Sequence, residues 1–173
     1  MSMSLYEVSV GSYLQILEAN LGVLAKAEAH LKKTGASPDD ILQDRLCEDM
    51  LPLEFQLRSI VHHSLGCVKG LEAGLFQPPA NEPDLDYATL KGRIENALSE
   101  LKAISPDTVN GYAGKTIVFK IGEREMPFTA EHFVLSFSLP NFYFHSTTCY
   151  DLLRKRGVAL GKIDYLGQMK ISR

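Results

Sequence analysis

Apolar residues recur at helical spacing over three long stretches of the chain, and each stretch predicts a helix. Between residues 5 and 33 they recur at i, i+3, i+4 and i+7, and Gly35 ends the pattern. The second stretch begins near Pro52 and runs to residue 73, where Gly74 is suited to follow a helix end. The third covers residues 86–104 and stops at Ser105-Pro106.

The pattern then changes to the alternation typical of strands. Residues 115–120 (KTIVFK), a turn at Gly122 and residues 124–128 predict a β-hairpin. Pro127 cannot donate a ladder hydrogen bond, so we expect its strand at a sheet edge.

A fourth helix is predicted over residues 129–157, with Thr129 as its N-cap. Pro140 lies in its middle and should kink it. The helix is apolar almost all round, which is typical of a buried helix. One stripe is polar, however, and it contains Ser138, Asn141, His145 and Thr148. Buried polar groups need partners, so this stripe should line a core network, a ligand pocket or a metal site.

Four helices with one hairpin predict an all-α fold, namely an up-down four-helix bundle with a short β-hairpin between helices three and four. We expect one domain over residues 1–173 whose tail, about 158–173, is irregular. A chain of this size can bury a sizeable core without disulfides.

Composition limits the classes of partner and the cell compartment that we expect. A net charge of −3 argues against nucleic acid as the main partner, because the chain has no excess of basic residues to neutralise phosphates. No stretch looks long and apolar enough to span a membrane, and the N-terminus lacks a basic signal-peptide region. Three cysteines without a CxxC pair fit a reducing compartment, so we expect a cytoplasmic protein.

The second helix offers a histidine to the polar stripe of the fourth. By angular position His63 lies just outside the apolar stripe of its helix, whereas His62 lies nearly opposite it. His63, Asn141 and His145 therefore form the candidate metal-ligating set, with Ser138 and Thr148 beside them. Imidazole nitrogens suit ions such as Zn²⁺ and Ni²⁺. A hydrogen-bonded core network is the other interpretation of the same residues.

Three runs of the sequence carry a resemblance to a known family: SLYEVSVGSYLQIL, DMLPLEFQLRSIVHHS and FTAEHFVLSFSLPNFYFHSTTCYDLLRKRGVALGKIDYLG. They resemble an uncharacterised domain-of-unknown-function family within the DinB/YfiT-like superfamily. The resemblance implies a four-helix bundle. Many superfamily members look like metalloenzymes with one histidine on helix two and an H-x3-H pair on helix four. His63 matches the first of these positions and His145 the last, while Asn141 stands where the pair has its first histidine.

The resemblance implies two classes of function. In the first, a polar pocket around His145 binds a divalent metal, Zn or Ni, and supports metal-assisted hydrolysis or thiol transfer. Glu28, on the inner stripe of the first helix, could then complete the shell. In the second, the protein is non-catalytic, either a small-molecule binder or a structural dimeric bundle with a degenerate metal site. We expect a homodimer, because a helix that is apolar on all sides can form the interface between two subunits.

Overall fold

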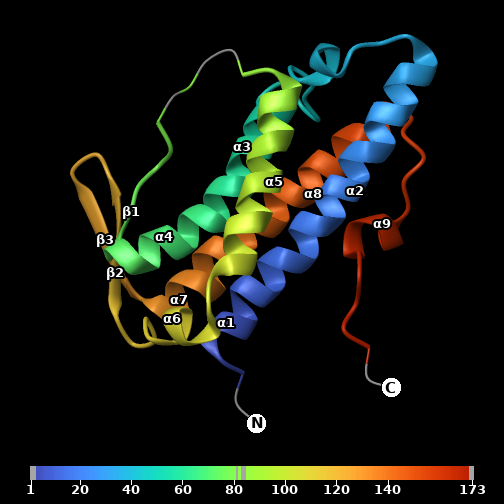
Figure 1. Cartoon of the computed structure of the whole chain (residues 1–173). Coiled ribbons are helices and arrows are strands. Elements are labelled where there is room, and N and C mark those ends of the chain that lie inside the picture. Colours follow the sequence, from blue (N-terminus) through green and yellow to red (C-terminus); the bar gives the residue numbers. More distant parts are fainter. Residues whose placement is uncertain (1–2, 81, 83–84, 172–173) are drawn as a thin grey trace.

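The computed structural model describes residues 3–80, 82 and 85–171. The chain is mostly helical, with a small three-stranded sheet at one end (Figure 1). Its main helices are α2 (Val10–Thr34), α3 (Leu53–His63), α4 (Leu65–Ala73), α5 (Tyr87–Ala103) and α8 (Leu139–Lys155). The shorter helical elements are α1 (Leu5–Val8), η1 (Pro38–Ile41), α6 (Pro106–Asn110), α7 (Ala130–Phe133), η2 (Val134–Ser138) and α9 (Lys162–Leu166).

Four helices surround the core. α2 packs against α5, α5 against α3, α3 against α8, and α8 against α2 again. The core between them is apolar, and its largest fully buried side chains include Tyr13, Phe133 and Phe142. Gly35 and Gly74 terminate their helices in the left-handed region, at φ 76° and 70°, as the sequence predicts.

The first two predicted helices are each interrupted once. Ser9 separates α1 from α2, and Ser64 separates α3 from α4. Both serine hydroxyls donate to the carbonyl four residues back, Ser9 to Leu5 at 2.6 Å and Ser64 to Ile60 at 2.7 Å. Such bonding bends a helix. The interruption at Ser64 directly follows His63 and so affects the candidate site.

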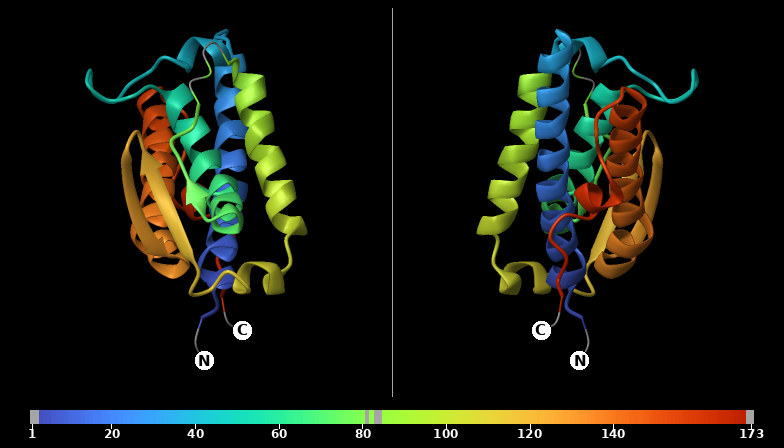
Figure 2. Two further views of the ribbon diagram at one scale, coloured as in Figure 1. Left: turned by 90° about the vertical axis from the view of Figure 1, so that its left-hand side faces the viewer. Right: turned by 90° about the vertical axis from the view of Figure 1, so that its right-hand side faces the viewer.

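The sheet is larger by one strand than the hairpin that the sequence predicts within a mostly helical fold. The predicted hairpin is present as β2 (Thr116–Ile121) and β3 (Arg124–Thr129), and Pro127 lies on the edge strand β3. A further strand, β1 (Leu75–Phe76), pairs in parallel with β2. Two residues are too few for a periodicity to show, so local pattern could not predict β1. Figure 2 shows the hairpin outside the helices, where its strands contact α7.

Pro140 acts on its helix in the way expected of a missing backbone donor. The turn before it, η2, is a π-helix in which the N–H of Leu139 bonds the carbonyl of Val134, five residues back. A π-turn accommodates a proline without ending the helix. The predicted fourth helix is therefore continuous through α7, η2 and α8.

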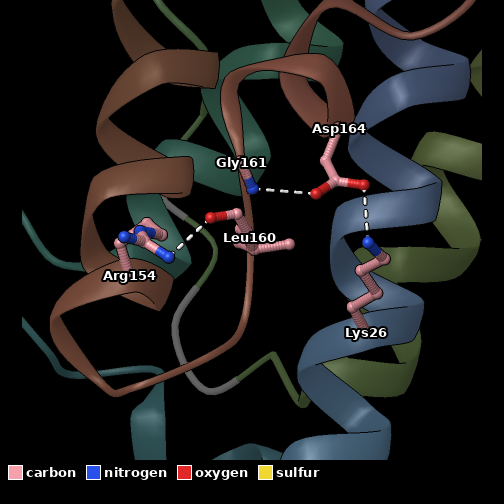
Figure 3. A network of polar contacts seen from close by, with 5 residues as sticks. All are labelled: Lys26, Arg154, Leu160, Gly161 and Asp164. Carbon is pink, nitrogen blue, oxygen red and sulfur yellow. Dashed lines mark hydrogen bonds and ion pairs between the residues drawn. The ribbon is translucent and has the colours of Figure 1, made fainter.

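The C-terminal tail is not wholly irregular, which corrects the prediction for residues 158–173. It contains α9, held against α2 by polar contacts (Figure 3). Asp164 accepts from the backbone N–H of Gly161 at 2.9 Å and pairs with Lys26 at 2.6 Å. Arg154 donates to the carbonyl of Leu160. These contacts cap a short helix that has little apolar periodicity of its own.

One expectation about membranes also needs correction. The segment Leu5–Thr34 is long and apolar enough to cross a membrane by length and composition alone. Half of that segment's most apolar window is buried inside the molecule. Its apolar face packs in the core, so the same composition is explained by a core helix.

Candidate functional site

The structure brings His63 and His145 together. His63 is the last residue of α3 and His145 lies in the middle of α8, and the two helices pack against each other. The ring centroids are 5.7 Å apart and the ring planes differ by 14°. Each residue is only 8% exposed. We call these two side chains the histidine pair.

Gln56 fixes the tautomer of His145. The Gln56 side-chain nitrogen donates to the carbonyl of Leu51 at 2.8 Å, so its oxygen is free to accept. That oxygen lies 2.7 Å from Nδ1 of His145. His145 therefore carries its proton on Nδ1, and its Nε2 keeps a lone pair.

His63 is held among aromatic rings and has an unsatisfied nitrogen. Phe76 and Phe137 lie against it, with centroid distances of 5.7 and 5.6 Å. Its Nδ1 is buried and has no hydrogen-bond partner within the part of the chain that the structure describes. A buried polar atom without a partner in a native protein calls for a ligand, an ion or a water.

Both imidazoles of the pair are neutral at physiological pH. Burial lowers the pKa of His63 from 6.5 to about 3, helped by the neighbouring His62 and His145. Burial also lowers the pKa of His145 from 6.5 to about 4, with His62 adding to the effect. Neutral imidazoles present lone pairs, which is the form that binds metal ions.

Ser138 supports the backbone under the pair. Its hydroxyl donates to the carbonyl of His63 at 2.6 Å and lies 2.8 Å from the hydroxyl of Tyr13. Since it donates to His63, the Tyr13 hydroxyl is the donor in the second bond. Ser138 and Tyr13 are fully buried. Ser138, the last residue of η2, thus joins the start of α8 to the end of α3 and to α2.

Asn141 and Thr148 each donate a side-chain hydrogen bond within their own helix. The Asn141 amide nitrogen donates to the carbonyl of Phe137 at 2.8 Å. The Thr148 hydroxyl donates to the carbonyl of Phe144, also at 2.8 Å. Their place on the polar stripe is as expected, but neither side chain bonds a residue of α3.

The site differs from the sequence predictions at two residues. Gln56 was missed although it stands seven residues before His63, a spacing that places both on one helix face. Glu28, expected as a possible partner, instead forms an ion pair with Lys91 at 2.8 Å. It is therefore committed to α5 and not to the histidine pair.

The donors present fit a two-histidine site rather than a complete shell. Among the described residues, no group of three or more His, Cys, Asp or Glu could hold a metal ion. Catalytic zinc sites use three protein ligands, and structural sites use four. A neighbouring cavity of about 240 Å³ includes His62 in its wall but neither member of the histidine pair.

Comparison with known proteins identifies the family. The model of the domain of unknown function DUF1993 matches residues 5–166. The chain belongs to the DUF1993 family. The DUF1993 fold also resembles the crystal structure of a DinB family member protein from Shewanella denitrificans, with a TM-score of 0.80. The two chains share 28% identity over 98% of this chain and 95% of that one. Among curated proteins, none matches.

The family assignment confirms the resemblance expected from the sequence. A DUF1993 domain on a DinB-like fold explains why His63 and His145 meet, since helices two and four of the predicted bundle are adjacent. It gives no reaction, because a fold hosts many functions and the site decides between them.

Proposed function

We propose that His63 and His145 are the protein ligands of a divalent transition-metal ion, Zn²⁺ or Ni²⁺, whose other positions are filled by water or a small molecule. The observation that carries this proposal is the orientation of His145 by Gln56. A metal-binding histidine usually donates its second ring nitrogen to a fixed acceptor, which sets the tautomer and the direction of the ring. Gln56 provides such an acceptor.

The charge state and spacing of the pair support the same proposal. Both rings are neutral, so a metal ion would not have to displace a proton. An ion bound at about 2.1 Å by two imidazoles brings the ring centroids to about 5–6 Å. The 5.7 Å separation of the pair lies in that range.

The reaction class would follow from the metal. An ion bound in this way polarises a coordinated water or thiol. Metal-assisted hydrolysis or thiol transfer is therefore the class we propose for an active enzyme, in line with the superfamily resemblance. The chain's own contribution is to orient His145 through Gln56 and to exclude bulk water with the surrounding phenylalanines.

A non-catalytic role is the second candidate. It is favoured by the low exposure of both histidines and by the lack of a third protein ligand among the described residues. In that case Gln56, His145 and the Leu51 carbonyl form a structural polar network. Removal of His145 would then leave the buried Gln56 oxygen unpaired and lower stability by about 1–3 kcal/mol.

Isothermal titration of chelator-treated protein with Zn²⁺ and Ni²⁺ tests the proposal. Binding by the wild type should be lost in His63→Ala and in His145→Ala. The exposed His132 provides the matched control, because His132→Ala removes an imidazole away from the pair and should leave binding unchanged. Absence of binding by the wild type would overturn the metal proposal and leave the structural role.

A further inference from the structure

The cavity of about 240 Å³ that has His62 in its wall lies beside the bundle and does not include the histidine pair. Its wall combines residues of α3, α4 and α5 with part of the segment between β1 and α5. The lining residues are Arg58, Val61, His62, Leu65, Gly66, Lys69, Pro79, Ala80, Glu82 and Arg93.

The wall of this cavity is more positive than the rest of the chain. Among the described residues that line it, Arg58, Lys69 and Arg93 are cations and Glu82 is the one carboxylate, whereas the whole chain has a net charge of −3. Clefts lined by charge of one sign concentrate ligands of the opposite sign. The wall therefore favours an anion.

Glu82 shows that a carboxylate fits against this wall. It comes from the segment between β1 and α5 and forms an ion pair with Arg93. Both side chains are substantially exposed, at 39% for Arg93 and 46% for Glu82. Exposed pairs contribute little stability, so a ligand carboxylate can replace Glu82 at small cost.

Lys69 is similarly available. Its pair with Glu100 leaves Lys69 59% exposed, and Glu100 does not line the cavity. Arg58 differs, because its ion pair with Glu54 is only 14% exposed on each side. Lys69 and Arg93 are thus the cations whose exposed carboxylate partners an anionic ligand can displace, while Arg58 keeps its less exposed partner Glu54.

Part of the cavity lining is apolar and can contact a ligand body. Val61 and Leu65 supply aliphatic surface. Gly66 lies beside His62, and a Cβ there would be 3.4 Å from Nδ1 of His62. A side chain at this position would therefore touch His62 and narrow the cavity.

We propose that this cavity binds a small organic anion, a carboxylate or phosphate carried on an apolar body. Lys69 and Arg93 bind the anionic group in exchange for Glu82, and the apolar body lies on Val61 and Leu65 beside Gly66. Anion binding here does not require a metal ion at the histidine pair.

The test follows amide chemical shifts of the full chain by NMR while benzoate or phenyl phosphate is added. Benzamide, a neutral molecule with the shape of benzoate, controls for the charge. We expect shifts in α3, α4 and α5 around the cavity with both anions up to about 10 mM, and none with benzamide. The stronger of the two anions identifies the preferred anionic group.

Variants with opposite expected effects sharpen the test. Lys69→Gln should weaken binding about tenfold, because it removes a charged hydrogen-bond donor. Lys102→Gln is the matched control, since Lys102 is 54% exposed and also paired with a glutamate, Glu18, away from the cavity. Glu82→Gln should instead tighten binding, because it removes the internal competitor for Arg93.

Gly66→Ala separates loss of binding from loss of folding. Alanine is favoured over glycine in a helix and meets no clash here, so the melting temperature should not fall. Anion binding should nevertheless weaken, and Gly22→Ala, at a helical position with open space, should leave it unchanged. The proposal is overturned if neither anion binds, if benzamide binds equally well, or if Lys69→Gln and Lys102→Gln bind alike.

Discussion

The neutral histidine pair should make the stability of the metal-free protein strongly dependent on pH. In the unfolded chain His63 and His145 take up protons near pH 6.5, whereas in the folded chain they do so near pH 3 and 4. Between these values the unfolded state binds more protons than the folded state. Stability is therefore highest above pH 6.5 and falls as the pH decreases toward the folded values.

The magnitude at pH 5 depends little on the folded pKa values, because both lie well below 5. At pH 5 the folded state must hold each imidazole unprotonated, and this lowers the free energy of unfolding by about 2 kcal/mol per histidine relative to pH 8. The two histidines together lower the free energy of unfolding by about 4 kcal/mol between pH 8 and pH 5. The pKa of His62 is lowered by burial as well, so it acts in the same direction.

Urea denaturation between pH 8 and pH 5 measures this effect. With a slope of about 2 kcal/mol/M, the midpoint should fall by about 2 M. His63→Gln and His145→Gln should each remove about 2 kcal/mol of the change in stability between pH 8 and pH 5, whatever they do to stability at pH 8. His132→Gln, at an exposed position, should leave it intact. A wild-type midpoint that stays constant to pH 5 would refute the reasoning. So would a double variant whose stability depends on pH as strongly as that of the wild type.

Three further predictions concern packing and assembly. Gln56→Leu should cost about 1–3 kcal/mol of stability in urea denaturation, because the Nδ1–H of His145 loses its acceptor; a cost below about 0.5 kcal/mol would contradict this. Ser138→Ala should cost about 2 kcal/mol by the same assay through two lost buried bonds, while Ser136→Ala at an exposed position should cost much less. We also expect a homodimer through the exposed aromatic side of α8, and Phe144→Glu, at a residue that is 55% exposed, should give monomers in light scattering. A monomeric wild type at micromolar concentration would rule the dimer out.

The sequence predicted the parts of the fold that depend on local pattern. Helix ends at Gly35 and Gly74 follow from the left-handed conformation that glycine adopts easily. The hairpin follows from the alternation of apolar and polar residues and from a glycine turn. The edge position of Pro127 follows from its missing backbone donor. β1 was missed because its partner lies more than 40 residues away, and a pair of that kind leaves no mark on two residues.

The interruptions at Ser9 and Ser64 could not be read from the sequence either. Serine is common in helices, and its bond to the carbonyl four residues back is compatible with a continuous helix. Here both serines are fully buried, where their hydroxyls must find partners. Their effect on the helix therefore depends on tertiary packing.

The candidate site was predicted as a facing pair but not as a network. Angular position on each helix brings His63 and His145 to the same interface, and this needs only the helical period. Which atoms they bond depends on side-chain rotamers. The Gln56 contact joins residues 89 positions apart, and the Asn141 amide turns back to its own helix.

Asn141 offers a gain-of-function test of the metal proposal. It stands four residues before His145, so both lie on the same face of α8, and it is only partly buried. Asn141→His should supply a third imidazole beside the histidine pair, at the cost of the amide bond to the Phe137 carbonyl. Three neutral nitrogens make a catalytic-type shell, so Zn²⁺ and Ni²⁺ should bind more tightly than to the wild type in isothermal titration.

The control for Asn141→His must add a histidine to the same helix on a different face. Asp151→His does so, because Asp151 is exposed and lies six residues beyond His145. It should leave the affinity of the wild-type site unchanged. If Asn141→His and Asp151→His bind the ions with equal affinity, the side chains at positions 141 and 145 do not bind one ion together with His63. The polar groups of the stripe are then a core network, and the buried Nδ1 of His63 is satisfied by water.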